Sequence, residues 1–87
     1  MTKNEFNARA AALLTTLEES SSGWAPRSHI QLGLGLTLND YLALESVMAR
    51  AGLITNTSEV VTITEDGRAL ARKINEELAK KTARSAG

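Results

Sequence analysis

Few residues in this sequence could do covalent or metal chemistry. The chain of 87 residues contains one histidine, His29, and no cysteine. A thiolate metal site, a disulfide and a catalytic cysteine are therefore excluded. A lone histidine without a neighbouring pair of carboxylates is more typical of a surface or half-buried structural residue than of a metal ligand or a general base. We expect no metal and no cofactor.

The glycines do not form a phosphate-binding loop. The stretch "GLGLTLND" at residues 33–40 alternates glycine with leucine. It lacks the third glycine of a dinucleotide fingerprint at the required offset, and no strand is predicted before it. Serine, histidine and aspartate are present, but nothing resembles a nucleophile elbow. An enzyme is therefore the least expected class.

The charge balance limits the choice of partners. Ten basic and ten acidic side chains cancel, which argues against binding nucleic acid by charge alone. Basic residues gather in the last third of the chain, where a solvated helix face with pairs such as Glu76 to Lys80 is the favoured interpretation. No apolar run approaches the length of a membrane span, so we expect a cytoplasmic protein with no membrane partner.

The hydrophobic periodicity predicts one α+β domain, mainly helical. "TKNE" at residues 2–5 has the pattern of a capping box, with Thr2 as its N-cap. Pro26 is expected at the first position of the second helix, with Trp24 folded back on Ile30. The predicted helices cover about residues 3–19, 26–32, 38–51 and 65–81, the predicted strands cover about 53–55 and 60–63, and residues 82–87 are expected to be a frayed tail.

The third predicted helix has two distinct faces. Asn39, Ala43, Ser46 and Arg50 follow one another at i, i+4, i+7 and i+11, so they line one side, here called the outer stripe. Any partner would meet this stripe. The expected buried side consists of Leu38, Tyr41, Leu42, Leu44, Val47, Met48 and Ala51.

Two strings in the second half of the chain carry a family resemblance. "RAGLIT" at residues 50–55 ends a helix, and "ITEDGRALA" at residues 63–71 opens the next one, with the short hairpin between them. In this order and spacing, residues 26–71 resemble the winged helix-turn-helix domains of small bacterial and phage transcription regulators. The resemblance covers about half of the chain.

The resemblance implies a regulator that binds double-stranded DNA with its third helix and its hairpin, the wing. Asn39 would then read adenine through a bidentate pair. The neutral charge, the acidic Asp40 and a wing that carries Glu59 but no lysine or arginine depart from that expectation. The residues that the resemblance places on DNA are Arg27, Ser28, Thr37, Asn39, Asp40, Ala43, Ser46, Arg50, Asn56, Thr57 and Ser58.

Two further interpretations concern protein partners. The small side chains of Ala43 and Ser46 would let another backbone approach, so the same helix could instead serve an assembly module that binds an unidentified protein and no DNA. Related regulators dimerise through their first and last helices, which implies a homodimer; the alternative is that these helices simply pack on each other. The expected dimer residues are Phe6, Leu13, Leu17, Ile74 and Leu78.

Overall fold

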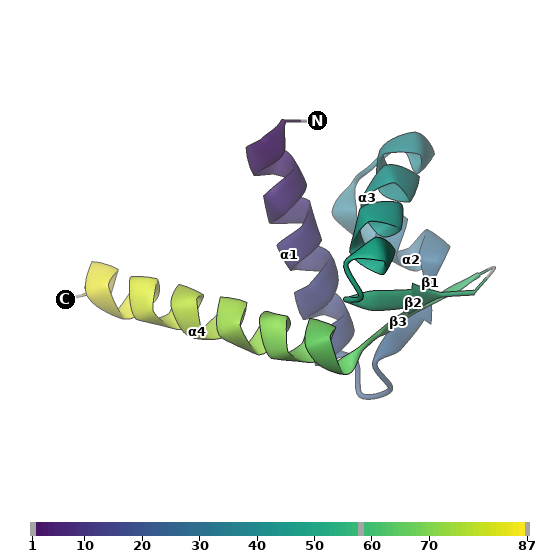
Figure 1. Ribbon diagram of the computed structural model, residues 1–87. Helices are drawn as coiled ribbons and strands as arrows, with labels where there is room; N and C mark the ends of the chain where they lie inside the picture. Colours follow the sequence, from purple (N-terminus) through teal and green to yellow (C-terminus); the bar gives the residue numbers. More distant parts are fainter. Residues whose placement is uncertain (1, 58, 87) are drawn as a thin grey trace.

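The protein is an α+β fold, mainly helical, with one small antiparallel sheet (Figure 1). The computed structural model describes residues 2–57 and 59–86, and the burial of residues 2–57 and 59–80. Along these residues the elements are α1 (Lys3–Glu19), β1 (Trp24–Pro26), α2 (Arg27–Leu34), α3 (Leu38–Arg50), β2 (Ile54–Asn56), β3 (Val60–Ile63) and α4 (Glu65–Ala86).

Threonines cap three of the helices, among them Thr2 as the sequence predicts. The Thr2 hydroxyl accepts a hydrogen bond from the Glu5 amide at 3.1 Å, and the Thr37 hydroxyl accepts one from the Asp40 amide at 3.2 Å. The Thr64 hydroxyl accepts from the Gly67 amide at 3.1 Å. Each hydroxyl satisfies one N–H that the first turn of a helix leaves without a backbone partner.

Helix α2 begins later and ends later than expected. Pro26 is its N-cap, with extended backbone angles, and is not the first helical residue. Gly33 stays helical, and the helix ends only at Gly35, whose φ of 67° is left-handed. The prediction of an end near Leu32 was wrong because only the second of the two glycines takes the positive φ that terminates a helix.

Strand β1 is an element that the sequence did not predict. Trp24 pairs with Thr62 and Pro26 with Val60, and the strand order is β1-β3-β2. Pro26 is tolerated because β1 is an edge strand, where a missing N–H need not break a ladder. Trp24 lies in this edge strand and keeps 46% of its surface exposed, and its packing on Ile30 stays a prediction.

The wing hairpin is formed by β2 and β3. Ile54 pairs with Ile63 and Asn56 with Val61, so β2 lies one residue further along than predicted. Val61 and Ile63 are buried while Thr62 between them is half-buried, so the hairpin has one buried side.

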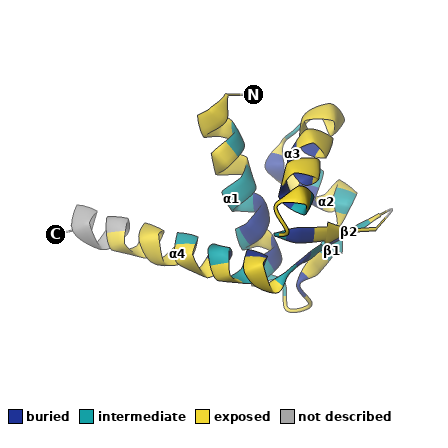
Figure 2. Cartoon of the chain, in the orientation of Figure 1, coloured by how far each residue is buried: buried dark blue, intermediate teal, exposed yellow. Residues whose placement is uncertain are grey.

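The core lies where α1, α2, α3 and the sheet meet (Figure 2). Leu13 and Leu17 of α1 are both completely buried, together with Tyr41 and Leu44 of α3 and Val61 of β3. Leu13 and Leu17 were expected at a dimer interface. That prediction was wrong, because both side chains are used inside the single chain.

The buried side of α3 differs from the expected one. Leu38, Leu42 and Val47 are 53%, 41% and 41% exposed, and Ala51, which caps the helix, is also exposed. Glu45 occupies an inward position instead and is 2% exposed. Tyr41, Leu44 and Met48 are buried as expected.

Helix α4 projects from the body of the molecule (Figure 1). It starts against α1, where Arg68 Nη1 and Arg72 Nε donate to the Glu18 carboxylate at 3.0 and 3.3 Å. It continues to Ala86, so the prediction of a frayed tail from residue 82 was wrong for residues 82–86; the two alanines and the arginine in this stretch favour helix. Gly87 lies outside the described residues. Within the described chain, no helix has the length and apolar character needed to cross a membrane.

Candidate nucleic-acid interface

The outer stripe of α3 is fully presented to solvent. Asn39, Ala43, Ser46 and Arg50 are all exposed, while Leu44 and Met48 point into the core. The stripe begins directly after the Thr37 cap, beyond the turn that separates α2 from α3. This exposure follows from the helical period, so the sequence could predict that the outer stripe faces solvent.

Apolar side chains flank the stripe. Leu42 lies on one side of it and Val47 on the other, as their helical spacing requires. Leu38 is exposed at the first turn of the same helix. Asp40 is also exposed in the first turn, next to the helix N-terminus that favours an acid. The exposed surface of α3 therefore carries mostly small or polar side chains along the outer stripe, with apolar side chains on either side of it.

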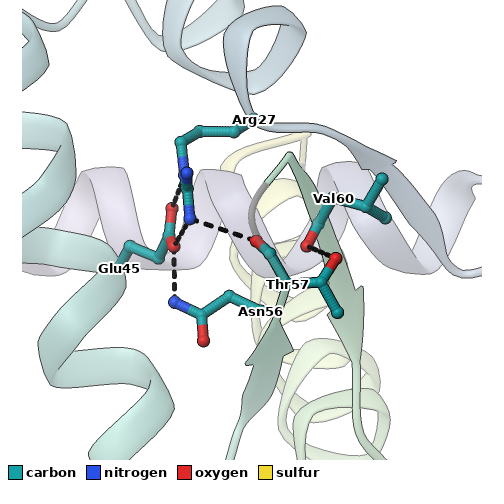
Figure 3. Close-up of polar contacts among 5 residues, drawn as sticks. All are labelled: Arg27, Glu45, Asn56, Thr57 and Val60. Carbon is teal, nitrogen blue, oxygen red and sulfur yellow. Dashed lines mark hydrogen bonds and ion pairs between the residues drawn. The ribbon is translucent and has the colours of Figure 1, made fainter.

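A buried carboxylate joins α2, α3 and the wing (Figure 3). Arg27 donates to both oxygens of Glu45, from Nε to Oε2 at 2.9 Å and from Nη2 to Oε1 at 2.6 Å. The Asn56 amide nitrogen donates to the same Oε1. Arg27 Nη2 also donates to the Thr57 carbonyl at 3.3 Å. The sequence reasoning did not predict this cluster, here called the Glu45 cluster and defined as Arg27, Glu45, Asn56 and Thr57.

The contacts within the Glu45 cluster favour the charged forms of Glu45 and Arg27. Burial alone would raise the pKa of the Glu45 carboxyl, but the hydrogen bonds from Arg27 and Asn56, together with the positive charge of Arg27, outweigh burial and hold this pKa below its ordinary value. The hydrogen bond to Glu45 in turn raises the pKa of Arg27. Both groups are therefore ionised near neutral pH.

Tyr41 lies beside the cluster without joining it. Its hydroxyl is buried and lies outside hydrogen-bond geometry with every described residue. Burial raises the pKa of Tyr41, and the nearby Glu45 carboxylate raises it further. The phenol is therefore neutral and acts as a core side chain.

The wing tip is polar and exposed. The Thr57 amide donates to the Val60 carbonyl at 2.9 Å and closes the hairpin turn. Thr57 and Glu59 are exposed, and the Asn56 side chain turns back toward α3. Ser58, the third wing residue expected on DNA, lies outside the described residues.

A shallow hollow lies between the start of α2, the start of α3 and the wing. It measures about 420 Å³ and contains Arg27 and Ser28, two of the residues expected near phosphate. Ser28 is exposed, but the guanidinium of Arg27 is engaged with Glu45. The residues lining the hollow are Pro26, Arg27, Ser28, Gln31, Leu38 and Glu59.

A second surface runs along α4. A hollow of about 340 Å³ is lined by Leu70, Lys73, Ile74, Glu77 and Leu78. Two of these, Ile74 and Leu78, were expected at a dimer interface; Ile74 is half-buried and Leu78 is 55% exposed. Phe6 of α1 is half-buried against the core.

The described residues contain no group of three or more histidine, cysteine, aspartate or glutamate side chains placed to hold a metal ion.

In comparisons with known proteins, no family model matches the sequence, and no curated protein is significantly similar to it.

Proposed function

We propose that the chain is a winged helix-turn-helix domain. The order of elements supports this: a first helix and a short strand precede two helices joined by a turn, and a hairpin then completes the sheet with that strand. The left-handed Gly35 ends the first helix of the pair, and the Thr37 cap starts the second. In this arrangement α3 is the helix that a partner would meet.

The domain binds double-stranded DNA through the outer stripe of α3, as a transcription regulator would. The observation that carries this proposal is the uninterrupted exposure of Asn39, Ala43, Ser46 and Arg50 along one helix face. Small side chains allow the helix to enter a major groove. Asn39, near the N-terminus of the helix, can donate to and accept from one adenine edge.

The charge of this surface implies weak binding by a single chain. Arg50 is the only cation of the outer stripe, and Arg27 is paired with Glu45. A protein with few phosphate contacts gains little from counterion release. Two linked copies would add their contacts over two half-sites, so the proposal includes a homodimer.

The face of α4 around Ile74 and Leu78 is the proposed dimer contact. It is apolar at its centre, and it carries Lys73 and Glu77 beside the apolar residues. A two-fold axis across this face can bring Lys73 of one copy close to Glu77 of the other, so the surface is complementary to itself in charge.

A second candidate is a protein-binding module without DNA affinity. The exposed Leu38, Leu42 and Val47 favour it, because three large apolar side chains on one exposed helix are more typical of a protein contact than of a groove-reading surface. In this case a partner protein would cover α3.

An amide NMR titration with a random DNA duplex separates the two candidates. For DNA binding we expect shifts at the outer stripe and at residues 56 and 57, weakening as salt rises from low to physiological concentration. Arg50→Ala should weaken the binding and reduce the salt slope by about one. The matched control is Arg9→Ala, an exposed arginine on α1. If the amides do not shift even at low salt, the DNA proposal is wrong for this chain.

A further inference from the structure

The Glu45 carboxylate lies where an apolar side chain would be expected. It is 2% exposed and faces inward on α3 among Tyr41, Leu44 and Met48. Burying an ion pair gains little stability over a well-packed apolar side chain of similar volume, because both charges lose their hydration. The pair does fix geometry, because a guanidinium that bonds both carboxylate oxygens sets the orientation of the two side chains relative to each other.

The bonds of this pair reach the distal part of the wing from two sides. Glu45 accepts from the Asn56 side chain at the end of β2. Arg27 donates through its side chain to the Thr57 carbonyl, and through its backbone amide to the Glu59 carbonyl at 2.8 Å. The β2 end of the wing turn is thus tied to the Glu45 carboxylate, directly through Asn56 and by way of the Arg27 side chain through Thr57 (Figure 3), while the other end is held by the backbone amide of Arg27.

Apolar packing holds the base of the wing but not its tip. Ile54, Val61 and Ile63 are buried, whereas Thr55, Asn56, Thr57 and Glu59 are exposed residues. These exposed side chains add little apolar packing at the tip, and Asn56 reaches α3 through its hydrogen bond to Glu45. Polar contacts therefore hold the tip: those of the Glu45 cluster, and the backbone hydrogen bonds from Arg27 to Glu59 and from Thr57 to Val60.

We infer that Glu45 is a positioning residue that fixes the wing tip relative to the outer stripe of α3. This inference rests on the proposed function, because the distance between wing and stripe decides whether both reach DNA together. It also changes the expected DNA contacts. Asn56 and Arg27 hold the wing in place, so Thr57 is the described wing residue best placed to meet the backbone.

The first test uses Glu45→Gln in the full-length chain without DNA. The glutamine keeps the volume but replaces one acceptor oxygen by a donor, so the three bonds that the carboxylate accepts, two from Arg27 and one from Asn56, can no longer all form. We expect the amide residual dipolar couplings of residues 55–57 and 59–60 to change or shrink relative to those of α3. Couplings in α1 and the first half of α4 should stay as in the wild type. The control is Glu76→Gln, an exposed glutamate on α4.

Unchanged wing couplings in a folded Glu45→Gln protein would overturn the inference. If that variant does not fold, Asn56→Ala replaces it, because Asn56 is exposed and its truncation removes only one bond of the cluster. A smaller change confined to the same wing amides is expected. Wild-type couplings in Asn56→Ala would then count against the inference.

Titrating the wild type and both variants with DNA tests this inference separately from the proposed function. If both hold, Glu45→Gln should keep the DNA-induced shifts of the outer stripe, lose those of the wing, and bind several-fold more weakly than Glu76→Gln. If the wild type shows no shifts with DNA, the proposed function fails while the dipolar couplings still decide the role of Glu45. If DNA binds but the wing couplings are the same in both proteins, the inference fails alone.

Discussion

Gly67 of α4 lies so close to the Leu53 carbonyl oxygen that a β-carbon at position 67 would collide with it and with the Ile63 side chain. The same carbonyl accepts a hydrogen bond from the Thr64 amide at 3.1 Å. The Thr64 hydroxyl donates to the Gly52 carbonyl at 2.6 Å and caps α4. The end of α3, the start of the wing and the start of α4 therefore meet at a point where only glycine fits.

Gly67→Ala should destabilise the protein. Alanine is the better helix former by about 1 kcal/mol, but the collision is with a backbone carbonyl that already holds a hydrogen bond, so it cannot be relieved by a rotamer change. We expect a net loss of about 1–3 kcal/mol in the free energy of unfolding, measured with urea. Gly33→Ala is the control: its added β-carbon meets no atom within 4 Å in the helix α2, and it should raise stability. Equal effects at the two positions would refute the close approach at Gly67.

Tyr41→Phe should not destabilise the protein. The Tyr41 hydroxyl is buried and has no hydrogen-bond partner among the described residues, so it loses its hydration without a replacement. Removing it should leave the free energy of unfolding unchanged or raise it by up to about 1 kcal/mol. Thermal and urea unfolding measure this directly. A clear loss of stability would mean that the hydroxyl makes a hydrogen bond in solution.

The contribution of Glu45 to stability should disappear in acid. Its pKa is lower in the folded chain than its ordinary value, so the ionised carboxylate stabilises the fold above the unfolded pKa, about 4.3. That contribution is lost as the pH falls through the folded pKa. The difference in unfolding free energy between the wild type and Glu45→Gln should therefore be largest near neutral pH and shrink as the pH falls below the ordinary glutamate pKa. Urea titrations at several pH values test this, with Glu76→Gln as the control. A difference that is constant with pH would contradict it.

The parts of the fold that the sequence predicted depend on neighbours along the chain. Thr2, Thr37 and Thr64 each cap a helix through an amide three residues away, so a short pattern contains all the information. The outer stripe of α3 was predictable for a similar reason, since it follows from the helical period alone. The stripe residues are exposed as predicted, and whether they contact DNA stays a prediction.

The parts that the sequence reasoning missed depend on partners far along the chain. Strand β1 has three residues, one of them a proline, and becomes a strand only because β3 lies beside it. Glu45 looked like an ordinary polar residue of a helix because its partner Arg27 is eighteen positions away. One signal was available: Glu45 falls on the inward side of the helical wheel with Tyr41, Leu44 and Met48. A buried charge requires a partner, so this position could have predicted an ion pair, though not which arginine forms it.

The self-association of the protein should depend on Leu78 and not on exposed leucine in general. Leu78 lines the hollow on α4 that is proposed as the dimer contact, and it is 55% exposed in the single chain. Burying a leucine in each copy contributes about 1.5–3 kcal/mol per side chain, so Leu78→Ser should raise the dimer dissociation constant at least about tenfold. Leu32→Ser on α2 removes an even more exposed leucine, 79% in the single chain, and should leave the constant unchanged. Sedimentation equilibrium over a range of concentrations measures both. A wild type that stays monomeric at the highest concentration would contradict the dimer, and equal effects of the two substitutions would place the contact away from α4.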